Sequence, residues 1–143
     1  RDAIQALADD GARRFKPILH AQYENATDAE SYLRAAVRAY FTFSAGEQEN
    51  WRLRRPAGEA VPHANDTPEI RAVFEEVRMV FADIMDRGLA PKVDLDYFAA
   101  ASIAIAREVC DKMLERRPVD IEGAVEFTVQ LILGGLPALP RTD

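Results

Sequence analysis

The sequence DIEGAVEFTVQLILGGL, residues 120–136, decides the fold of this chain. At 100° per residue its apolar positions cover roughly 240° of a helical circumference, whereas a surface helix of a monomer needs an apolar stripe only somewhat wider than about 100°. A helix with this pattern has two faces to bury. One face can pack against its own chain, and we predict that the other packs against a second copy of the chain.

A second apolar-rich stretch, residues 94–116, precedes it, and the two meet at a tight corner at residues 117–119. Helical periodicity extends over almost all of the remaining chain. We expect helices at residues 2–24, 27–46, 67–88, 94–116 and 120–136, a short helical piece at 47–54 and a loop at 55–66. This pattern predicts an all-α fold, an antiparallel bundle of about five to six helices that forms one domain over residues 1–143.

Local signals give the expected limits of the second helix. Thr27 has the side chain of an N-cap, and Glu30 is placed to reach back to it in a capping box. Gly46 is predicted to end this helix. Arg34 and Arg38 lie opposite its apolar face, so we expect both in solvent.

The other helices carry similar signals. Pro17 cannot donate an interior helical hydrogen bond, so we expect a kink or a break near residues 14–17. Gly88 is predicted to end the third long helix. Asp94 is predicted to cap the fourth.

Composition limits the classes of protein to which this chain can belong. A net charge of −6 argues against a chain that grips nucleic-acid phosphates by itself. No apolar run approaches the ~20 residues that a membrane span needs, and no signal peptide is visible, so we expect no membrane association. The single cysteine, Cys110, fits a reducing compartment, and we predict a cytoplasmic protein. Because the chain opens at Arg1 within a helical pattern, we expect a fragment that lacks an N-terminal part.

The titratable residues form no recognisable catalytic or metal site. His20 has Glu24 one turn later, which is far short of a metal site, and the other histidine, His63, falls in the expected loop. Adjacent carboxylates on a helix point about 100° apart and do not converge. We interpret both such pairs, Asp9-Asp10 and Glu75-Glu76, as solvent-exposed. We therefore predict no enzymatic activity, no metal and no cofactor.

Aromatic side chains from four segments are the better signal for a ligand. A mostly apolar cavity with a few polar groups is the usual small-molecule site, and buried Tyr and Trp need partners for their polar tips. Ordinary core packing is the other interpretation, and the sequence leaves it open. The predicted ligand-binding residues are Tyr40, Phe43, Trp51, Phe74, Phe81, Met85, Phe98, Ser102 and Arg107.

Arg107 interrupts the apolar pattern of the fourth long helix. It is either a pocket cation that fixes an acidic ligand or one half of an i,i+4 ion pair with Asp111. The sequence does not decide between these two roles.

Three stretches resemble the regulators of the tetracycline-repressor (TetR) family. RGLAPKVDLD, residues 87–96, is similar to the connection before the next-to-last helix of those proteins. EFTVQLILGGL, residues 126–136, resembles their final helix, and RDAI, residues 1–4, resembles the start of the helix after their DNA-binding domain. The chain departs from the family's pattern at Pro17 and at Arg107-Glu108.

The resemblance implies an effector-binding and dimerisation domain, with DNA contacted only through an N-terminal helix-turn-helix domain absent from this chain. The last two helices of each copy would form a four-helix bundle in a homodimer. A small, largely apolar effector would tilt the first helix and change the spacing of the DNA-binding domains. The interface residues predicted on this basis are Ile105, Val109, Phe127, Leu131 and Leu133.

Two other classes of protein remain open from the sequence. One is a small all-helical enzyme or cofactor carrier, and the other is a structural dimerisation or adaptor bundle. A ligand cavity would separate the regulator from the adaptor, which needs none. The identity of the effector, the operator sequence and the sense of regulation are not encoded in any visible motif.

Overall fold

The structure is a computed structural model that describes residues 3–54 and 68–142, with side chains for 10–50 and 71–142. The predictions for Trp51, His63 and the loop at 55–66 lie outside the described residues or side chains. The helices are α1 (Ala3–Glu24), α2 (Ala29–Arg54), α3 (Pro68–Asp86), α4 (Leu95–Glu115) and α5 (Ile121–Gly135), followed by a 3₁₀ turn at Leu136–Ala138. The predicted all-α helical bundle is confirmed.

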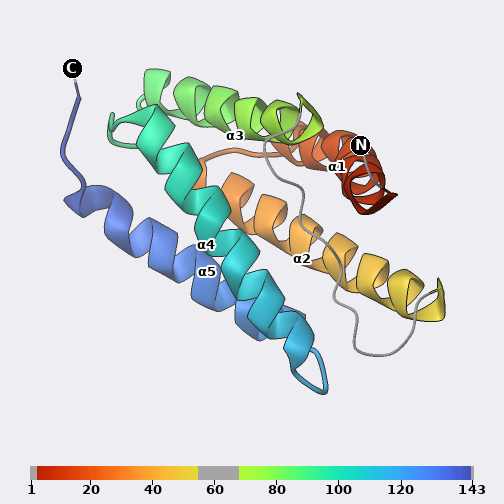
Figure 1. The fold of residues 1–143 in the computed structure, drawn as a ribbon. Coiled ribbons are helices and arrows are strands. Elements are labelled where there is room, and N and C mark those ends of the chain that lie inside the picture. The colour runs from red at the N-terminus through yellow and green to blue at the C-terminus, as the bar shows by residue number, and fades with distance from the viewer. Residues whose placement is uncertain (1–2, 55–67, 143) are drawn as a thin grey trace.

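Helix α2 lies at the centre of the arrangement. It packs against α1 on one side and against α4 and α5 on the other, while α3 bridges α1 and α4. Figure 1 shows α4 and α5 side by side and running in opposite directions. After α5 the chain returns to the α3–α4 connection, where the Thr142 N–H donates to the Lys92 carbonyl at 2.8 Å.

The core is built from α2, α3, α4 and α5. Tyr32 and Phe41 of α2 and Phe81 of α3 are fully buried. The Phe81 ring makes edge contacts with Tyr32 at 5.7 Å and with Phe98 at 4.8 Å between ring centroids. Edge-to-face pairs of this kind add to the stabilisation from apolar burial.

Of the kink or break expected near Pro17, the break is wrong, because α1 runs without interruption from Ala3 to Glu24, and the kink stays a prediction. Pro17 itself is exposed, whereas Phe15 and Leu19 on either side of it are buried. Burial of these two side chains offsets the hydrogen bond that Pro17 cannot donate. Tertiary packing therefore overrides the local signal here.

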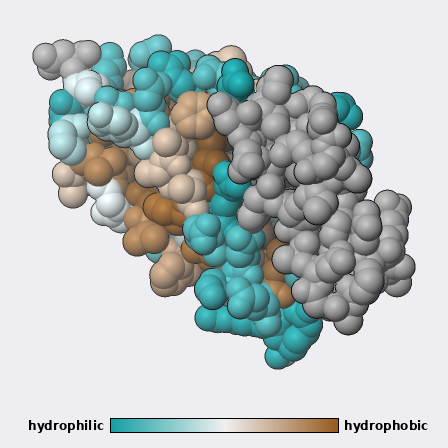
Figure 2. Space-filling view, viewed as in Figure 1, coloured by the Kyte–Doolittle hydropathy of each residue, from teal (hydrophilic) through white to brown (hydrophobic). Residues whose placement is uncertain are grey.

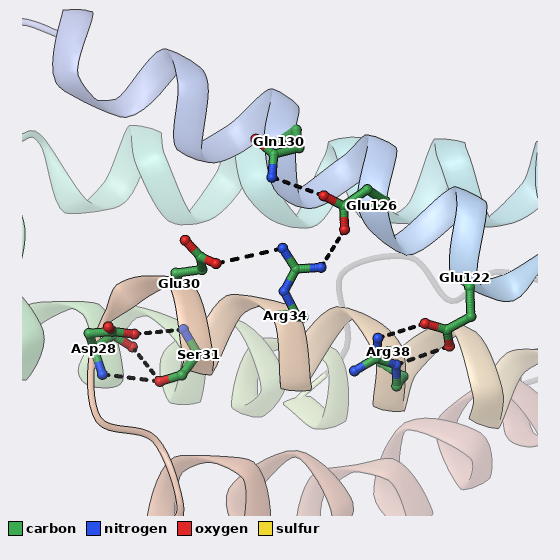
Figure 3. A network of polar contacts seen from close by, with 8 residues as sticks. All are labelled: Asp28, Glu30, Ser31, Arg34, Arg38, Glu122, Glu126 and Gln130. Carbon is green, nitrogen blue, oxygen red and sulfur yellow. Dashed lines mark hydrogen bonds and ion pairs between the residues drawn. The ribbon is translucent and has the colours of Figure 1, made fainter.

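Two predictions for the second helix are also wrong. The N-cap is Asp28 rather than Thr27: its Oδ1 accepts from the Ser31 N–H at 2.7 Å, and the Ser31 hydroxyl accepts from the Asp28 N–H at 3.1 Å. Ser31 thus replaces Glu30 in a reciprocal box (Figure 3). Gly46 does not end the helix, because α2 continues to Arg54 and includes the short piece expected at 47–54.

The remaining boundary predictions are confirmed. Gly88, at φ 74°, follows α3, and the Gly88 and Leu89 N–H groups donate back to the carbonyls of Met85 and Ile84, each at 3.0 Å. This is the Schellman arrangement, which favours glycine. Asp94 caps α4 by accepting from the Tyr97 N–H at 3.0 Å. Among the described residues, no helix is long and apolar enough to cross a membrane.

Gly46 gives a test of the α2 boundary. It is exposed, lies inside the helix, and a Cβ placed on it meets nothing within 4 Å. We expect Gly46→Ala to raise the free energy of unfolding by about 0.5–1 kcal/mol, because alanine loses less backbone entropy in a helix. Urea unfolding at fixed protein concentration measures this. Gly88→Ala is the matched control and should lower the free energy of unfolding, since φ is positive at Gly88. If Gly46→Ala also lowered the free energy of unfolding, the helix would end at Gly46.

Candidate functional site

The outer face of α4 and α5 carries large apolar side chains in contact with solvent. Tyr97 is 78% exposed, Phe127 63% and Leu131 51%. Ala101 and Ala104 of α4 are exposed beside them. Figure 2 shows this outer face as a largely hydrophobic surface over α5 and the first half of α4. Contiguous apolar surface on a soluble protein marks an interaction site.

The helical geometry of α5 accounts for this exposure. Val125, Val129 and Ile132 are buried against the rest of the chain. Phe127 and Leu131, one turn apart, point to the opposite side of the helix. The apolar pattern of α5 therefore divides into a covered face and an uncovered face within a single chain.

The predicted interface residues separate into two groups. Phe127 and Leu131 lie on the outer face, whereas Ile105, Val109 and Leu133 are half-buried and pack against the core cluster. Leu133 lies seven residues after Glu126 and therefore shares the flank of α5 that faces α2. Tyr97, the most exposed of the large apolar residues, was not among the predicted interface residues. It lies four residues before Ala101 and seven before Ala104, a spacing that puts all three on one face of the helix, and this spacing could have identified it.

The same flank of α5 is tied to α2 by a ladder of ion pairs (Figure 3). The Arg38 guanidinium donates to both carboxylate oxygens of Glu122, at 2.6 and 3.1 Å, and Arg34 donates to Glu126. Arg38 is exposed as expected, whereas Arg34 is half-buried, and α5 packs along α2 so that its two glutamates lie opposite both arginines. These hydrogen bonds lower the pKa of Glu122 and of Glu126.

The predicted ligand-binding residues fall into two places. Phe81, Met85 and Phe98 belong to the main core cluster, where the Phe81 and Phe98 rings are in contact, and Ser102 is buried on α4. Tyr40 and Phe43 of α2 lie near α1, and both rings contact Phe15, at 5.6 and 5.4 Å. Phe74 is half-buried on α3. The structure thus brings Phe81 and Phe98 into contact in one place and sets Tyr40 and Phe43 against one ring in another.

Polar groups gather around the Tyr40 hydroxyl at the contact between α2 and α4. Burial raises the pKa of Tyr40, while a hydrogen bond with Ser44 and the nearby Arg107 charge oppose that rise. Burial also raises the pKa of the Cys110 thiol to about 11, so the thiol stays protonated at neutral pH. Arg107, which is half-buried, and Asp111 are the charged groups of α4 whose fields act on Tyr40.

A separate open groove of about 380 Å³ runs between α1 and α2. Among the predicted ligand-binding residues that have described side chains, Phe43 lines it. The other lining residues are Ile18, Gln22, Ala35, Arg38, Ala39 and Thr42. The groove is mostly apolar, with the Arg38 guanidinium at its edge.

One acidic side chain contradicts its predicted exposure. Glu76 of α3 is only 8% exposed, because it faces α1 and contacts Nδ1 of His20. His20 also approaches its predicted neighbour Glu24, at 3.7 Å from Nε2. A search of the described residues for three or more grouped histidines, cysteines or carboxylates that could hold a metal finds none.

Comparison with known proteins gives one informative similarity. No protein-family model matches the chain. The chain is 29% identical over 118 residues to the HTH-type transcriptional activator FasR of Mycolicibacterium smegmatis, an alignment that covers 81% of this chain and 53% of that protein. The chain thus spans about half the length of this relative. The similarity supports a transcription regulator.

The ion-pair ladder predicts a pH-dependent contribution to stability. The pKa values of Glu122 and Glu126 are lower in the folded state than their ordinary value of 4.5, so the contribution is present above that pH and is lost as the pH falls through the lowered values. We expect Glu122→Gln with Glu126→Gln to lower Tm at pH 7 by on the order of a few degrees.

Thermal unfolding at several pH values measures this difference. Because glutamine resembles a protonated glutamate, the difference in Tm between the variant and the native chain should narrow as the pH falls below 4.5. At pH 7, 1 M salt should reduce the same difference. A difference in Tm that is equal at pH 7 and pH 3 would contradict the role assigned to the ladder.

Proposed function

We propose that this chain is the effector-binding and dimerisation part of a ligand-responsive transcription regulator that resembles the TetR family. The outer face of α4 and α5 is the observation that carries the proposal. Phe127 and Leu131 expose more than half of their surface in one chain, on a helix whose other face is fully covered. A second copy that packs on this face would remove these side chains from water.

The outer face suits a two-fold symmetric contact. Tyr97, Ala101 and Ala104 lie on one stripe of α4 that carries one large side chain and two small ones. In a symmetric dimer the same patch meets itself, and we propose that Tyr97 of one copy packs on these small residues of the other. The result is the four-helix bundle of α4 and α5 from two copies that the resemblance implies.

We propose that the effector binds next to Tyr40. Polar groups in an apolar setting are typical of small-molecule sites, and the half-buried Tyr40, Ser44 and Arg107 supply such groups on α2 and α4. A largely apolar molecule with an acidic or hydrogen-bonding group fits this combination.

DNA contact is assigned to a part outside this chain. The chain carries a net charge of −6, which opposes direct binding to phosphates. The similar protein is named as an HTH-type activator, and this chain spans about half of its length. Helix α1, which packs on both α2 and α3, is the element through which an effector would act on the part that precedes it.

A structural dimerisation module is the second candidate. The close contact of Phe81 with Phe98, and the burial of both, favour it because they fill the space between α3 and α4. Such a module would share the dimer but would bind no small molecule. The two candidates therefore differ in ligand binding and agree in oligomeric state.

The dimer is tested by charge placed on the outer face. We expect Phe127→Glu and Leu131→Glu to give folded monomers, because each residue is exposed in one chain but would be buried without a partner for its charge in the dimer. Light scattering after size-exclusion chromatography measures the mass, and circular dichroism checks the fold.

Met79→Glu is the matched control for these variants. Met79 is half-exposed on α3, away from the outer face, so this variant should remain dimeric. The dimer assignment fails if all three variants keep the same mass as the native chain, or if Met79→Glu dissociates as fully as the other two.

Ligand binding is tested with anilinonaphthalene sulfonate, an apolar molecule with an acidic group. We expect saturable binding to the folded dimer, weakened about tenfold by Arg107→Met because a charge-assisted contact is lost. Lys112→Met, which removes an exposed cation of the same helix, should leave the affinity unchanged. Equal affinity in both variants, or no saturable binding, would favour the structural module.

A further inference from the structure

The open groove between α1 and α2 has the volume and the lining of a small-molecule site. Its volume of about 380 Å³ lies within the range of about 300–1,000 Å³ that such sites occupy. Ile18 of α1 and the half-buried Ala35 and Ala39 of α2 give it apolar walls. Because Ile18 is one of the exposed large apolar residues of the chain, an apolar molecule in the groove would remove it from water.

The aromatic wall of the groove is held in place by α1. Phe43 lines the groove, and its ring contacts the Phe15 ring at 5.4 Å between centroids. The Arg14 guanidinium lies over the Phe43 ring, 5.5 Å from its centroid, and donates to Glu47 at 3.2 Å. These contacts order the Phe43 side chain before a ligand arrives, so the binding step does not have to order it.

Arg38 supplies hydrogen-bond donors at the edge of the groove. Its Nε and Nη2 atoms donate to the two carboxylate oxygens of Glu122, at 3.1 and 2.6 Å (Figure 3). Its Nη1 atom has no hydrogen-bond partner among the described residues. Because a guanidinium is planar and carries donors on all three nitrogens, the pair with Glu122 orients Arg38 and leaves the Nη1 donors for another acceptor.

The charges on this flank favour an uncharged acceptor over an anion. The two arginines of the ion-pair ladder, Arg34 and Arg38, face the three carboxylates of Glu30, Glu122 and Glu126. The flank therefore has no excess positive charge to offset the cost of taking another carboxylate out of water. A carbonyl oxygen can accept from Nη1 without that cost.

The other polar groups that line the groove are also uncharged. Thr42 brings a hydroxyl, and Gln22 brings a side-chain amide. The amide nitrogen of Gln22 already donates to the Ile18 carbonyl at 2.9 Å, which holds the side chain along α1. Apolar walls with a few uncharged polar groups suit a neutral ligand.

We propose that the groove between α1 and α2 binds an uncharged, largely apolar molecule with a carbonyl group. The carbonyl oxygen accepts a hydrogen bond from Nη1 of Arg38, and the apolar part lies between Ile18 and Phe43. This site differs from the one proposed beside Tyr40, where Arg107 would favour an acidic group. It goes beyond the proposed function and does not depend on it.

Prodan, an uncharged fluorescent naphthyl ketone, tests the site on the 143-residue chain. We expect saturable binding with a blue shift of its emission, weakened roughly tenfold by Arg38→Met because a hydrogen bond from a charged donor is lost. Arg34→Met is the matched control. It also removes an ion pair with α5, but Arg34 does not line the groove, so the affinity should equal that of the native chain.

Two further measurements test the place and the chemistry of the site. Ala39→Leu fills the groove and should abolish Prodan binding, whereas anilinonaphthalene sulfonate, the probe of the site beside Tyr40, should still bind. Dimethylaminonaphthoate, which carries a carboxylate on the same ring system, should bind severalfold more weakly than Prodan. Circular dichroism and light scattering should show that both Arg variants and Ala39→Leu keep the fold and the mass of the native chain.

The proposal is overturned if Prodan does not bind saturably, if Arg34→Met weakens binding as much as Arg38→Met, or if Ala39→Leu leaves it unchanged. Equal or tighter binding of the naphthoate would assign the groove to anions and would also contradict it. A lower mass of Ala39→Leu would make the groove a contact between copies instead. A native chain that is monomeric, or that does not bind the sulfonate, would contradict the proposed function and leave the Prodan result interpretable.

Discussion

The excess apolar surface of α5 is the constraint on which the rest of the structure depends. Fifteen residues of one helix carry more apolar side chains than the remaining helices of one chain cover. Its inner face, with Val125 and Val129, completes the core on α2 and α4. Its outer face, with Phe127 and Leu131, remains in water unless another molecule covers it. The fold of one chain and the association that we propose therefore have a common origin in this helix.

Helix α2 connects the pair of helices α4 and α5 to α1. Its arginines bind the glutamates of α5, its aromatic residues Tyr40 and Phe43 reach the ring of Phe15 on α1, and Tyr32 lies against α3. A change at the contact between α2 and α4 would thus reach both α5 and α1 through one element. This connectivity is what a regulator needs if a ligand between the helices is to act on α1.

Sequence alone predicted the fold class, the two-faced α5 and the caps at Gly88 and Asp94, because these follow from periodicity and local backbone chemistry. It failed at Pro17 and Gly46, where packing of neighbouring residues keeps a helix intact. It also failed at Arg34 and Glu76, whose environments depend on a partner helix distant in the sequence. Tyr97 was missed for a similar reason, since only the assembled pair of α4 and α5 shows which stripe stays uncovered. The assignment of individual ligand-binding and interface residues stays a prediction.

The most direct test of this account is sedimentation equilibrium of the unmodified chain over a range of micromolar concentrations. Association through the outer face predicts a mass of twice the 16.0 kDa chain. A mass of 16.0 kDa throughout that range would contradict it, because the apolar face of α5 would then be stable in water without a partner.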